Sequence, residues 1–269
     1  MAKIIKKASG LEQEYFENST RAKEMDKKSG KWLLGVALGF ALMVLGVVLL
    51  ALDTDNRLIT AILLGAGLLS IIISSICAHY YGAASFEKNS NNSVLGAGNQ
   101  GENATANIVS ALPNSFVGFQ NVVVTFEGQK SEMDMVVVGP TGVYIIETKN
   151  HNGTIYGGYA DRNWIQHKIG RRGSPYQNEI YSPVKQVGTH IYRLANYLRS
   201  NGARVHVDGL VYFSNYEAVL QLHGKPDKIP VFSASGNDFA SINRYIVSGD
   251  ITLDNATVNK VYNLLNRAH

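Results

Sequence analysis

Two long apolar runs stand out in the first third of the chain. Trp32–Leu52 and Leu58–Ala78 contain no charged residue, and only the short polar segment Asp53–Arg57 separates them. A helix rises about 1.5 Å per residue, so each run is long enough to cross a hydrocarbon core of about 30 Å. The pattern predicts a transmembrane helical hairpin over residues 32–81. A buried helical hairpin in a soluble protein is the less favoured interpretation.

The charges beside these runs predict their orientation. Lys27, Lys28 and Lys31 precede the first run, whereas the connecting segment holds one Arg and two Asp. Lys and Arg accumulate on the cytoplasmic side of membrane helices, so residues 1–31 are expected in the cytoplasm. Two crossings return the chain to the same side, and everything after Tyr81 is therefore expected to be cytoplasmic as well.

Small residues within the first apolar run suggest close helix packing. Gly35-x-x-x-Gly39 has the spacing that lets two helices approach closely, which makes an oligomer possible. Glycine is common in such spans, so the spacing alone does not establish association. Cys77, the only cysteine, lies in the second run, which excludes an internal disulfide and a cysteine-rich zinc site.

The remainder of the chain has weaker and shorter patterns. Residues 4–28 mix charges with few apolar positions and predict a surface helix or a disordered segment, residues 82–94 predict a polar linker, and residues 95–269 predict one domain. Within the domain we expect helices over 101–112, 183–200, 240–246 and 256–267, strands over 121–126, 132–138, 143–149, 154–159, 205–213, 218–222 and 231–232, and a loop over 160–180. This order of elements predicts an α/β fold with a mixed central sheet flanked by helices.

Net charge and glycine patterns add little about function. The formal charge of +4 is too small to argue for nucleic acid by itself. Residues 96–101 match the dinucleotide-binding fingerprint by letter, but a polar linker precedes them instead of a strand, so a Rossmann fold is not predicted. The chain has no phosphate-binding loop of the Gly-x4-Gly-Lys type, so ATP is not implied.

The candidate chemistry lies on two neighbouring strands. Asp134 precedes the apolar run of the first strand, and Glu147 and Lys149 end the second, with Gly139-Pro-Thr-Gly142 as the turn between them. A plain two-residue loop would place Asp134 directly across from Glu147, with Cβ atoms about 4.5–5.5 Å apart. The residues Gly-Pro-Thr-Gly better suit a type I turn with a bulge at Gly142, which would shift the pairing by one residue and turn Asp134 away. A further bulge near the site would restore the arrangement.

Acidic groups in strands this apolar are costly unless something pairs with them. Asp134, Glu147 and the backbone carbonyl of Thr148 offer the oxygen ligands that Mg²⁺, or Mn²⁺ in its place, prefers. A cation held there would activate water and polarise a phosphate, while Lys149 would orient the water and offset transition-state charge. The pattern predicts the metal site of a nuclease. The alternative is a surface hairpin with an ordinary Glu–Lys pair.

A longer series of residues resembles the nuclease-related domain (NERD) family. The series is Gly98-x-x-Gly101-Glu102, Glu132-Met-Asp134, Gly139-Pro-Thr-Gly-Val-Tyr-Ile-Ile-Glu147-Thr-Lys149-Asn150, Gly153-Thr-Ile, Trp164, Ser182-Pro183 and Gln186, within about residues 95–215. That family is grouped with the PD-(D/E)xK nucleases, so the resemblance implies a restriction-endonuclease-like core. It also implies Asp134, Glu147 and Lys149 as catalytic centre, with Glu102 and Gln186 as supporting polar groups. Met133 stands where the superfamily name has Pro.

These observations predict a membrane-anchored, metal-dependent nuclease that cleaves DNA or RNA on the cytoplasmic side. Arg162, Lys168, Arg171 and Arg172 are candidate contacts to the phosphate backbone, although a solvated loop is an equally good interpretation. His151 and His190 are possible neighbours of the site. The alternative function is a catalytically inactive, membrane-tethered module that binds nucleic acid or protein, because folds of this kind also host inactive members.

Overall fold

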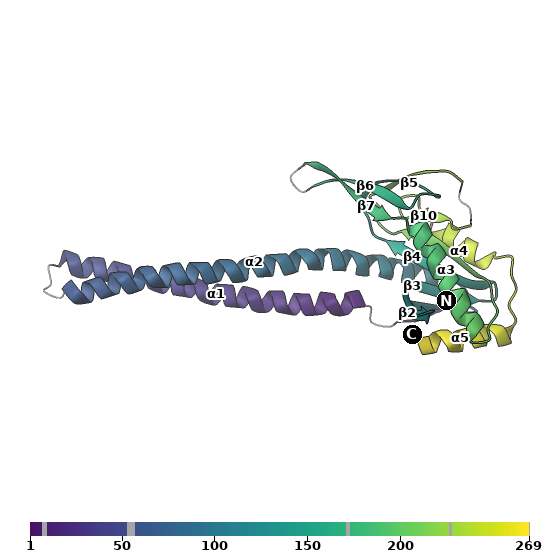
Figure 1. Ribbon diagram of the computed structural model, residues 1–269, viewed down its shortest axis with the longest axis horizontal. Helices are drawn as coiled ribbons and strands as arrows, with labels where there is room; N and C mark the ends of the chain where they lie inside the picture. Colours follow the sequence, from purple (N-terminus) through teal and green to yellow (C-terminus); the bar gives the residue numbers. More distant parts are fainter. Residues whose placement is uncertain (7–9, 53–56, 171–172, 226–227, 269) are drawn as a thin grey trace. The chain divides into compact units, whose positions relative to one another are not determined.

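The computed structural model describes residues 1–6, 10–52, 57–170, 173–225 and 228–268. These residues form two units, one of Gly10–Gly96 and one that joins Met1–Ser9 to Ala97–His269. In chain order the elements are β1 (Lys3–Ile5), α1 (Gly10–Ala51), α2 (Arg57–Ser110), β2 (Val117–Phe126), β3 (Gln129–Gly139), β4 (Gly142–Lys149), β5 (Gly153–Gly158), β6 (Asn163–Ile169), β7 (Pro175–Tyr181), α3 (Pro183–Ser200), β8 (Val207–Phe213), β9 (Ala218–His223), β10 (Val231–Ser233), α4 (Phe239–Val247) and α5 (Asn255–Ala268) (Figure 1).

The first unit is an antiparallel pair of helices, α1 and α2, held together through small residues. The Ser85 hydroxyl donates to the carbonyl of Ala22 at 3.2 Å. Further along, a Cβ added at Gly39 would lie 2.7 Å from the backbone oxygen of Gly67, and the reverse contact is equally close. Gly39 therefore serves the packing of α1 against α2 of the same chain, which leaves the predicted oligomer without support from this glycine.

Two polar segments that the sequence left without firm structure are helical. α1 begins at Gly10, so most of residues 4–28 is helix, and residues 82–94 are part of α2 instead of an irregular linker. The two segments pair with each other, as the Ser85–Ala22 hydrogen bond shows. Tertiary packing thus overrides the weak helix propensity of the Asn- and Ser-rich stretch.

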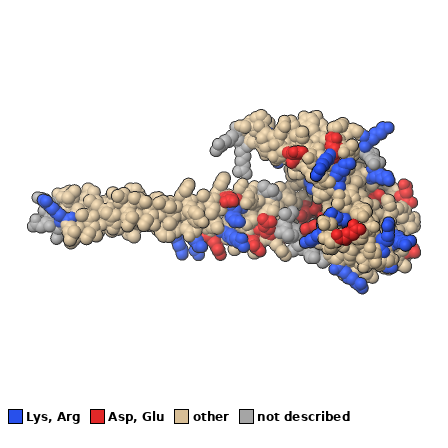
Figure 2. All heavy atoms as spheres, viewed as in Figure 1, with Lys and Arg blue, Asp and Glu red and all other residues tan. Residues whose placement is uncertain are grey.

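Both helices are long and apolar enough to cross a membrane. Their apolar side chains are largely uncovered, with Leu34 71% and Leu50 62% exposed. In Figure 2 the outer part of this helix pair presents no Lys, Arg, Asp or Glu between its tip and the polar segments. A core helix of a soluble protein would have such a surface buried, and the described chain provides nothing that buries it.

The second unit is built on a six-stranded mixed sheet in the order β1-β2-β3-β4-β8-β10. β2, β3 and β4 form an antiparallel meander, whereas β8 pairs with β4, and β10 with β8, in parallel. Short β1, which the sequence did not predict, adds in parallel to β2. The predicted mixed α/β architecture is confirmed.

Helices cover both faces of this sheet, and a separate core lies on each. On one face α3 and α5 contribute Leu194, Leu198 and Leu265 to a core with Val136 and Ile145. The opposite core contains side chains of the end of α2, of α4 and of the sheet: Ile108, Val109, Met135, Val137, Tyr144, Ile146, Ile242 and Ile246. Neighbouring residues of β3 and β4 enter opposite cores, as the alternation of a strand buried on both faces requires.

A second sheet, in the order β7-β6-β5-β9, occupies the region that the sequence predicted to be loop. β6 and β7 form an antiparallel hairpin from Asn163 to Tyr181, so the predicted loop over 160–180 is wrong. The prediction failed because β7 is exposed at nearly every position and therefore lacks the apolar alternation that marks a strand. Trp164 is fully buried and anchors the hairpin by stacking on Phe213 at 6.2 Å.

The connection between β4 and β8 determines where α3 lies. Parallel neighbours cannot be joined by a tight turn, so the chain leaves β4, forms β5 to β7, and returns through α3 before β8. Ser182 caps α3, since its side chain accepts a hydrogen bond from the Lys185 amide, and Pro183 occupies the first turn. The helix begins where the sequence predicted and brings its first turns beside the carboxyl end of β4.

Candidate functional site

The β3–β4 turn has the register on which the predicted site depends. Gly139 pairs with Gly142 and Met135 with Ile146, so Pro140 and Thr141 form a two-residue loop. The alternative with a bulge at Gly142 is excluded. Asp134 comes directly before Met135, and Glu147 directly after Ile146. Both acids therefore lie just beyond the last β3–β4 pair, on the side away from the turn.

An irregularity in β2 and β3 lies at the aspartate. The register passes from Gln120↔Met135 to Val122↔Met133, and Asn121 adopts a left-handed φ of 56° between them. Met133 packs in the core that contains α3, whereas Met135 packs in the opposite core. Side chains two apart in a regular strand share a face, so the strand is twisted at Asp134.

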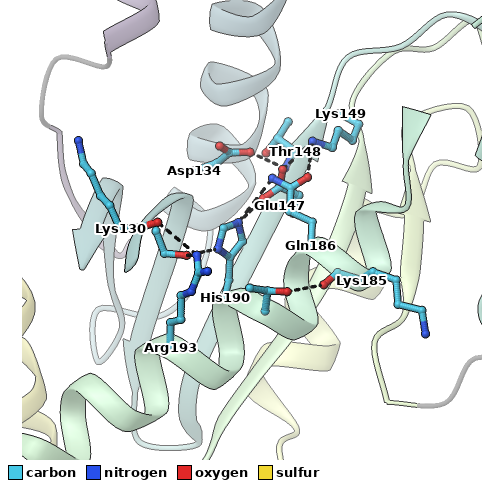
Figure 3. A network of polar contacts seen from close by, with 11 residues as sticks. Lys130, Asp134, Glu147, Thr148, Lys149, Lys185, Gln186, His190 and Arg193 are labelled. Atoms are coloured by element: carbon cyan, nitrogen blue, oxygen red, sulfur yellow. Dashed lines mark hydrogen bonds and ion pairs between the residues drawn. The ribbon is translucent and has the colours of Figure 1, made fainter. Parts of the chain in front are cut away.

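The carboxyl end of β4 brings three predicted residues together (Figure 3). Lys149 Nζ donates to Glu147 Oε1 at 2.7 Å and to Gln186 Oε1 at 3.0 Å. The Glu147 side chain is 3% exposed and that of Lys149 is 21% exposed. The ammonium is thus held by two oxygens while keeping access to solvent.

Asp134 closes the site from the neighbouring strand. Its Oδ2 accepts a hydrogen bond from the Thr148 amide at 2.8 Å. The carbonyl of Lys149 accepts from the Ser214 amide at 2.9 Å, which directs the backbone of Lys149 toward the other side of β4. Successive residues of a strand direct their backbone groups to opposite sides, so the carbonyl of Thr148 faces the same side as its amide, toward Asp134.

Burial and neighbouring charge act strongly on Asp134. Burial raises the pKa of Asp134 well above its ordinary value, and the negative charge of Glu147 raises it further. The hydrogen bond from Thr148 and the charge of Lys149 oppose this rise without cancelling it. Asp134 therefore resists ionisation until a positive charge is supplied.

Glu147 is shifted in the opposite direction. Burial raises its pKa, but His190 and Lys149 together outweigh burial, so the pKa of Glu147 lies below its ordinary value. Its Oε2 is buried, lies 3.5 Å from His190 Nε2, and accepts no hydrogen bond of normal geometry from the described residues. A buried carboxylate oxygen that lacks a hydrogen-bond donor is well suited to binding a cation.

The oxygen atoms at this corner fit a hard divalent cation. Asp134 and Glu147 supply carboxylates and Thr148 a carbonyl, and a positive charge between them would relieve the repulsion that raises the pKa of Asp134. Among the described residues no group of three His, Cys, Asp or Glu side chains converges as a closed metal cage would require. An open site of this kind suits Mg²⁺, which keeps several waters.

The remaining predicted residues lie around this centre in different ways. Glu102, at the end of α2, is buried, and its charge contributes to raising the pKa of Asp134. Arg162 is exposed and Lys168 is on β6 opposite Tyr176, whereas Arg171 and Arg172 lie outside the described residues. Glu102 therefore belongs to the electrostatic surroundings of the site.

His151 and Lys168 connect the second sheet to the site. Burial, together with the charges of Lys149 and Lys168, lowers the pKa of His151 to about 4. The imidazole is therefore neutral near pH 7. Since both lysines act on one ring, Lys168 contributes to the positive potential beside Lys149.

Sequence reasoning named His190 as a possible neighbour of the site but missed Ser131 and Arg193, the polar groups that contact each other beside it. His190 lies one turn beyond Gln186 on α3 and its Nδ1 is 2.9 Å from the Ser131 hydroxyl on β3. Arg193 donates to the same hydroxyl at 3.1 Å. The spacing of Gln186, His190 and Arg193 gives one face of a helix and was available as a signal, whereas an isolated serine on a strand carried none.

Comparison with known proteins identifies the part of the chain that carries this site. Residues 97–214 match the nuclease-related domain family. The chain is also 36% identical over 92 residues to an uncharacterised protein of Bacillus anthracis, which corresponds to 34% of this chain and 43% of that protein. The chain thus spans less than half the length of this relative. No solved structure shows significant similarity.

Removing the charge of Asp134 should stabilise the metal-free protein. A carboxyl whose pKa is raised on folding stabilises the fold at low pH and loses that contribution as pH rises through the folded pKa. Asp134→Asn should therefore raise the unfolding temperature at pH 8 in EDTA, by about 2–4 °C for each kcal/mol relieved, and much less at pH 4.5. Intrinsic fluorescence during heating of the detergent-solubilised chain measures the unfolding temperature at both pH values.

Added Mg²⁺ provides the internal control for this variant. It should stabilise the wild-type chain and have little effect on Asp134→Asn. Equal stabilisation of both proteins by Mg²⁺ would contradict a cation site at Asp134.

Proposed function

Since residues 97–214 match the nuclease-related domain, we propose that this chain is a membrane-anchored, divalent-metal-dependent nuclease that hydrolyses phosphodiester bonds of DNA or RNA in the cytoplasm. The observation that carries the proposal is the convergence of Asp134, Glu147 and Lys149 at the end of β4 (Figure 3). The same three residues were predicted from the sequence as a PD-(D/E)xK centre.

The two carboxylates and the Thr148 carbonyl would hold Mg²⁺ or Mn²⁺. When bound there, the cation supplies Lewis-acid polarisation of the phosphate and a more acidic water. Asp134 and Glu147 contribute the negative charge that makes binding favourable, and Glu102 adds to the negative potential from α2. Burial of these acids strengthens their attraction for a cation, because the local dielectric constant is low.

Lys149 is the residue best placed to act on the substrate. Its ammonium is partly exposed and is positioned by Glu147 and Gln186. From this position it would donate to a phosphate oxygen, where charge accumulates in the transition state, and would orient the attacking water. Gln186 keeps the ammonium in place through its carbonyl oxygen.

The substrate would lie toward the second sheet. Lys168 and exposed Arg162 are there, and Lys168 already acts electrostatically on His151. Arg171 and Arg172, in the same hairpin by sequence, are proposed as further phosphate contacts. Tyr176, 45% exposed and directly across from Lys168, provides an aromatic surface beside a cation.

The apolar part of α1 and α2 would anchor the chain. Two helices of sufficient length, with exposed apolar side chains, are suited to a bilayer. The lysines that precede Trp32 favour a cytoplasmic N-terminus, and an even number of crossings then keeps the nuclease domain on the same side.

Cleavage should depend on the acid–lysine centre and on a divalent cation. We expect Lys149→Ala and Glu147→Gln to lower kcat for plasmid cleavage in Mg²⁺ or Mn²⁺ by at least about 10²–10³-fold, because each removes a preorganised charge at the reaction centre. EDTA should abolish the wild-type activity. Gel analysis of plasmid and labelled oligonucleotides measures the rates.

Lys185→Ala is the matched control, since Lys185 is an exposed lysine one residue before Gln186. It should cleave like the wild type. Equal cleavage by wild type and Lys149→Ala would assign the activity to a contaminant or to another site. Salt-sensitive binding without hydrolysis under any divalent cation would favour the non-catalytic binding module.

Lys168 should contribute to substrate affinity without contributing to chemistry. We expect Lys168→Gln to weaken binding uniformly across sequences and to reduce the slope of log affinity against log salt by about 1. Fluorescence anisotropy of a labelled oligonucleotide in EDTA measures this. Lys260→Gln, on α5, is the control, and an unchanged slope in Lys168→Gln would remove this lysine from the interface.

The membrane anchor and its orientation are tested together. The full chain should remain in the membrane pellet after alkaline carbonate extraction. In inverted membrane vesicles, trypsin should digest the domain of residues 97–268, because that domain faces outward there. Protection in inverted vesicles with digestion in spheroplasts would show the opposite orientation.

A further inference from the structure

A chain of polar side chains connects Arg193 on α3 to Glu147 behind the candidate active site (Figure 3). Arg193 Nη1 lies 3.1 Å from the Ser131 hydroxyl, which lies 2.9 Å from His190 Nδ1. His190 Nε2 lies 3.5 Å from Glu147 Oε2. Ser131 and His190 are both buried, so these contacts are formed away from bulk water.

The donors and acceptors of these groups favour one direction of hydrogen bonding. A guanidinium only donates, so the Ser131 oxygen accepts from Arg193. The Ser131 hydroxyl is then free to direct its own proton at His190 Nδ1, 2.9 Å away. In that arrangement Nδ1 is the acceptor and the ring proton is on Nε2, which faces Glu147.

A second neighbour of Nε2 competes with Glu147. The Gln186 amide nitrogen also lies 3.5 Å from Nε2, and Gln186 must direct its carbonyl at Lys149, because an ammonium cannot accept. A lone pair on Nε2 would suit Gln186 but would face the buried Glu147 carboxylate. A hydrogen bond to an ionised carboxylate is about twice as strong as one between neutral groups, so the proton on Nε2 is favoured.

We propose that His190 is a positioning residue for Glu147, and that Ser131 and Arg193 fix the imidazole in the tautomer that presents its Nε2–H to the carboxylate. Lys149 donates to Oε1 at 2.7 Å, and an Nε2–H on His190, 3.5 Å from Oε2, would act on the other oxygen, so that the two groups together orient the carboxyl group. The role resembles that of the outer hydrogen bonds around metal ligands in general, which orient the ligand and maintain its charge.

The catalytic consequence of this inference rests on the proposed nuclease function, but the tautomer does not. Histidine can be labelled with ¹⁵N in the full-length, detergent-solubilised chain, and long-range ¹H–¹⁵N correlation spectra at pH 8 distinguish protonated from unprotonated ring nitrogens. His190→Gln identifies the His190 signals by their loss. We expect an unprotonated Nδ1 and a protonated Nε2 in the wild type, and a shift toward protonated Nδ1 or mixed tautomers in Ser131→Ala.

Conservative variants separate positioning from a merely structural role. Ser131→Thr keeps the hydroxyl, and His190→Gln keeps an N–H near the place of Nε2, whereas Ser131→Ala and His190→Leu remove these groups. We expect the latter two to lower Mn²⁺ affinity, measured by electron paramagnetic resonance without substrate, and kcat by about 10–100-fold. Ser131→Thr and His190→Gln should retain most of the wild-type Mn²⁺ affinity and kcat. KM should change little in all four variants.

His206→Gln is the matched histidine control, because His206 is an exposed histidine paired with Asp208. It should behave as wild type in every measurement. Protonated Nδ1 in the wild type would overturn the proposal in favour of a Gln186–His190 hydrogen bond. Unchanged Mn²⁺ affinity in both Ser131→Ala and His190→Leu would overturn it as well. Absence of cleavage by the wild type, with the expected tautomer and Mn²⁺ affinities, would refute the nuclease proposal while supporting the positioning of Glu147.

Discussion

The site depends on two neighbouring carboxylates, buried Glu147 and partly buried Asp134, that cannot both be charged without cost. Asp134 and Glu147 lie next to Met135 and Ile146, the last residues that β3 and β4 pair on the side away from their turn. One acid is stabilised in its charged form by Lys149 and His190, and the other is pushed toward its neutral form by burial and by the first. Such a pair costs stability in the absence of a cation, and a cation bound between the two acids would relieve that cost.

The scaffold explains how these acids can be held so close. A sheet covered on both faces fixes the backbone of β3 and β4, and the two-residue turn fixes their register. The left-handed backbone of Asn121 on β2 lies opposite Asp134 and interrupts the regular alternation of side chains between the two faces of the sheet. α3 adds the side chains of Gln186, which accepts from Lys149, and His190, which lies 3.5 Å from Glu147.

The sequence predicted those features that depend on local signals. The place of the turn Gly139–Gly142, the Pro183 helix start and the β-branched run of β8 each have a local physical cause. The register of the turn was not predicted, because the residues Gly-Pro-Thr-Gly favoured a bulge at Gly142 that the structure lacks. β7 was missed because its residues are exposed on both faces, and the helical form of residues 82–94 was missed because it depends on a partner helix. Ser131 and His190 are 59 positions apart, and no local pattern joins them.

The crossover between β4 and β8 has a consequence for how such a protein can diverge. Asp134, Glu147 and Lys149 precede this excursion and Gln186 and His190 follow it, and Lys149 and Gln186 are 37 positions apart in the sequence. Most of the residues in between form β5, β6 and β7 of the second sheet, which contributes no member of the acid–lysine–glutamine set. Changes in the length or side chains of this excursion would leave the acid–lysine–glutamine set in place while altering the surface beside it. Under the proposed nuclease function, target preference would then change independently of the residues at the reaction centre.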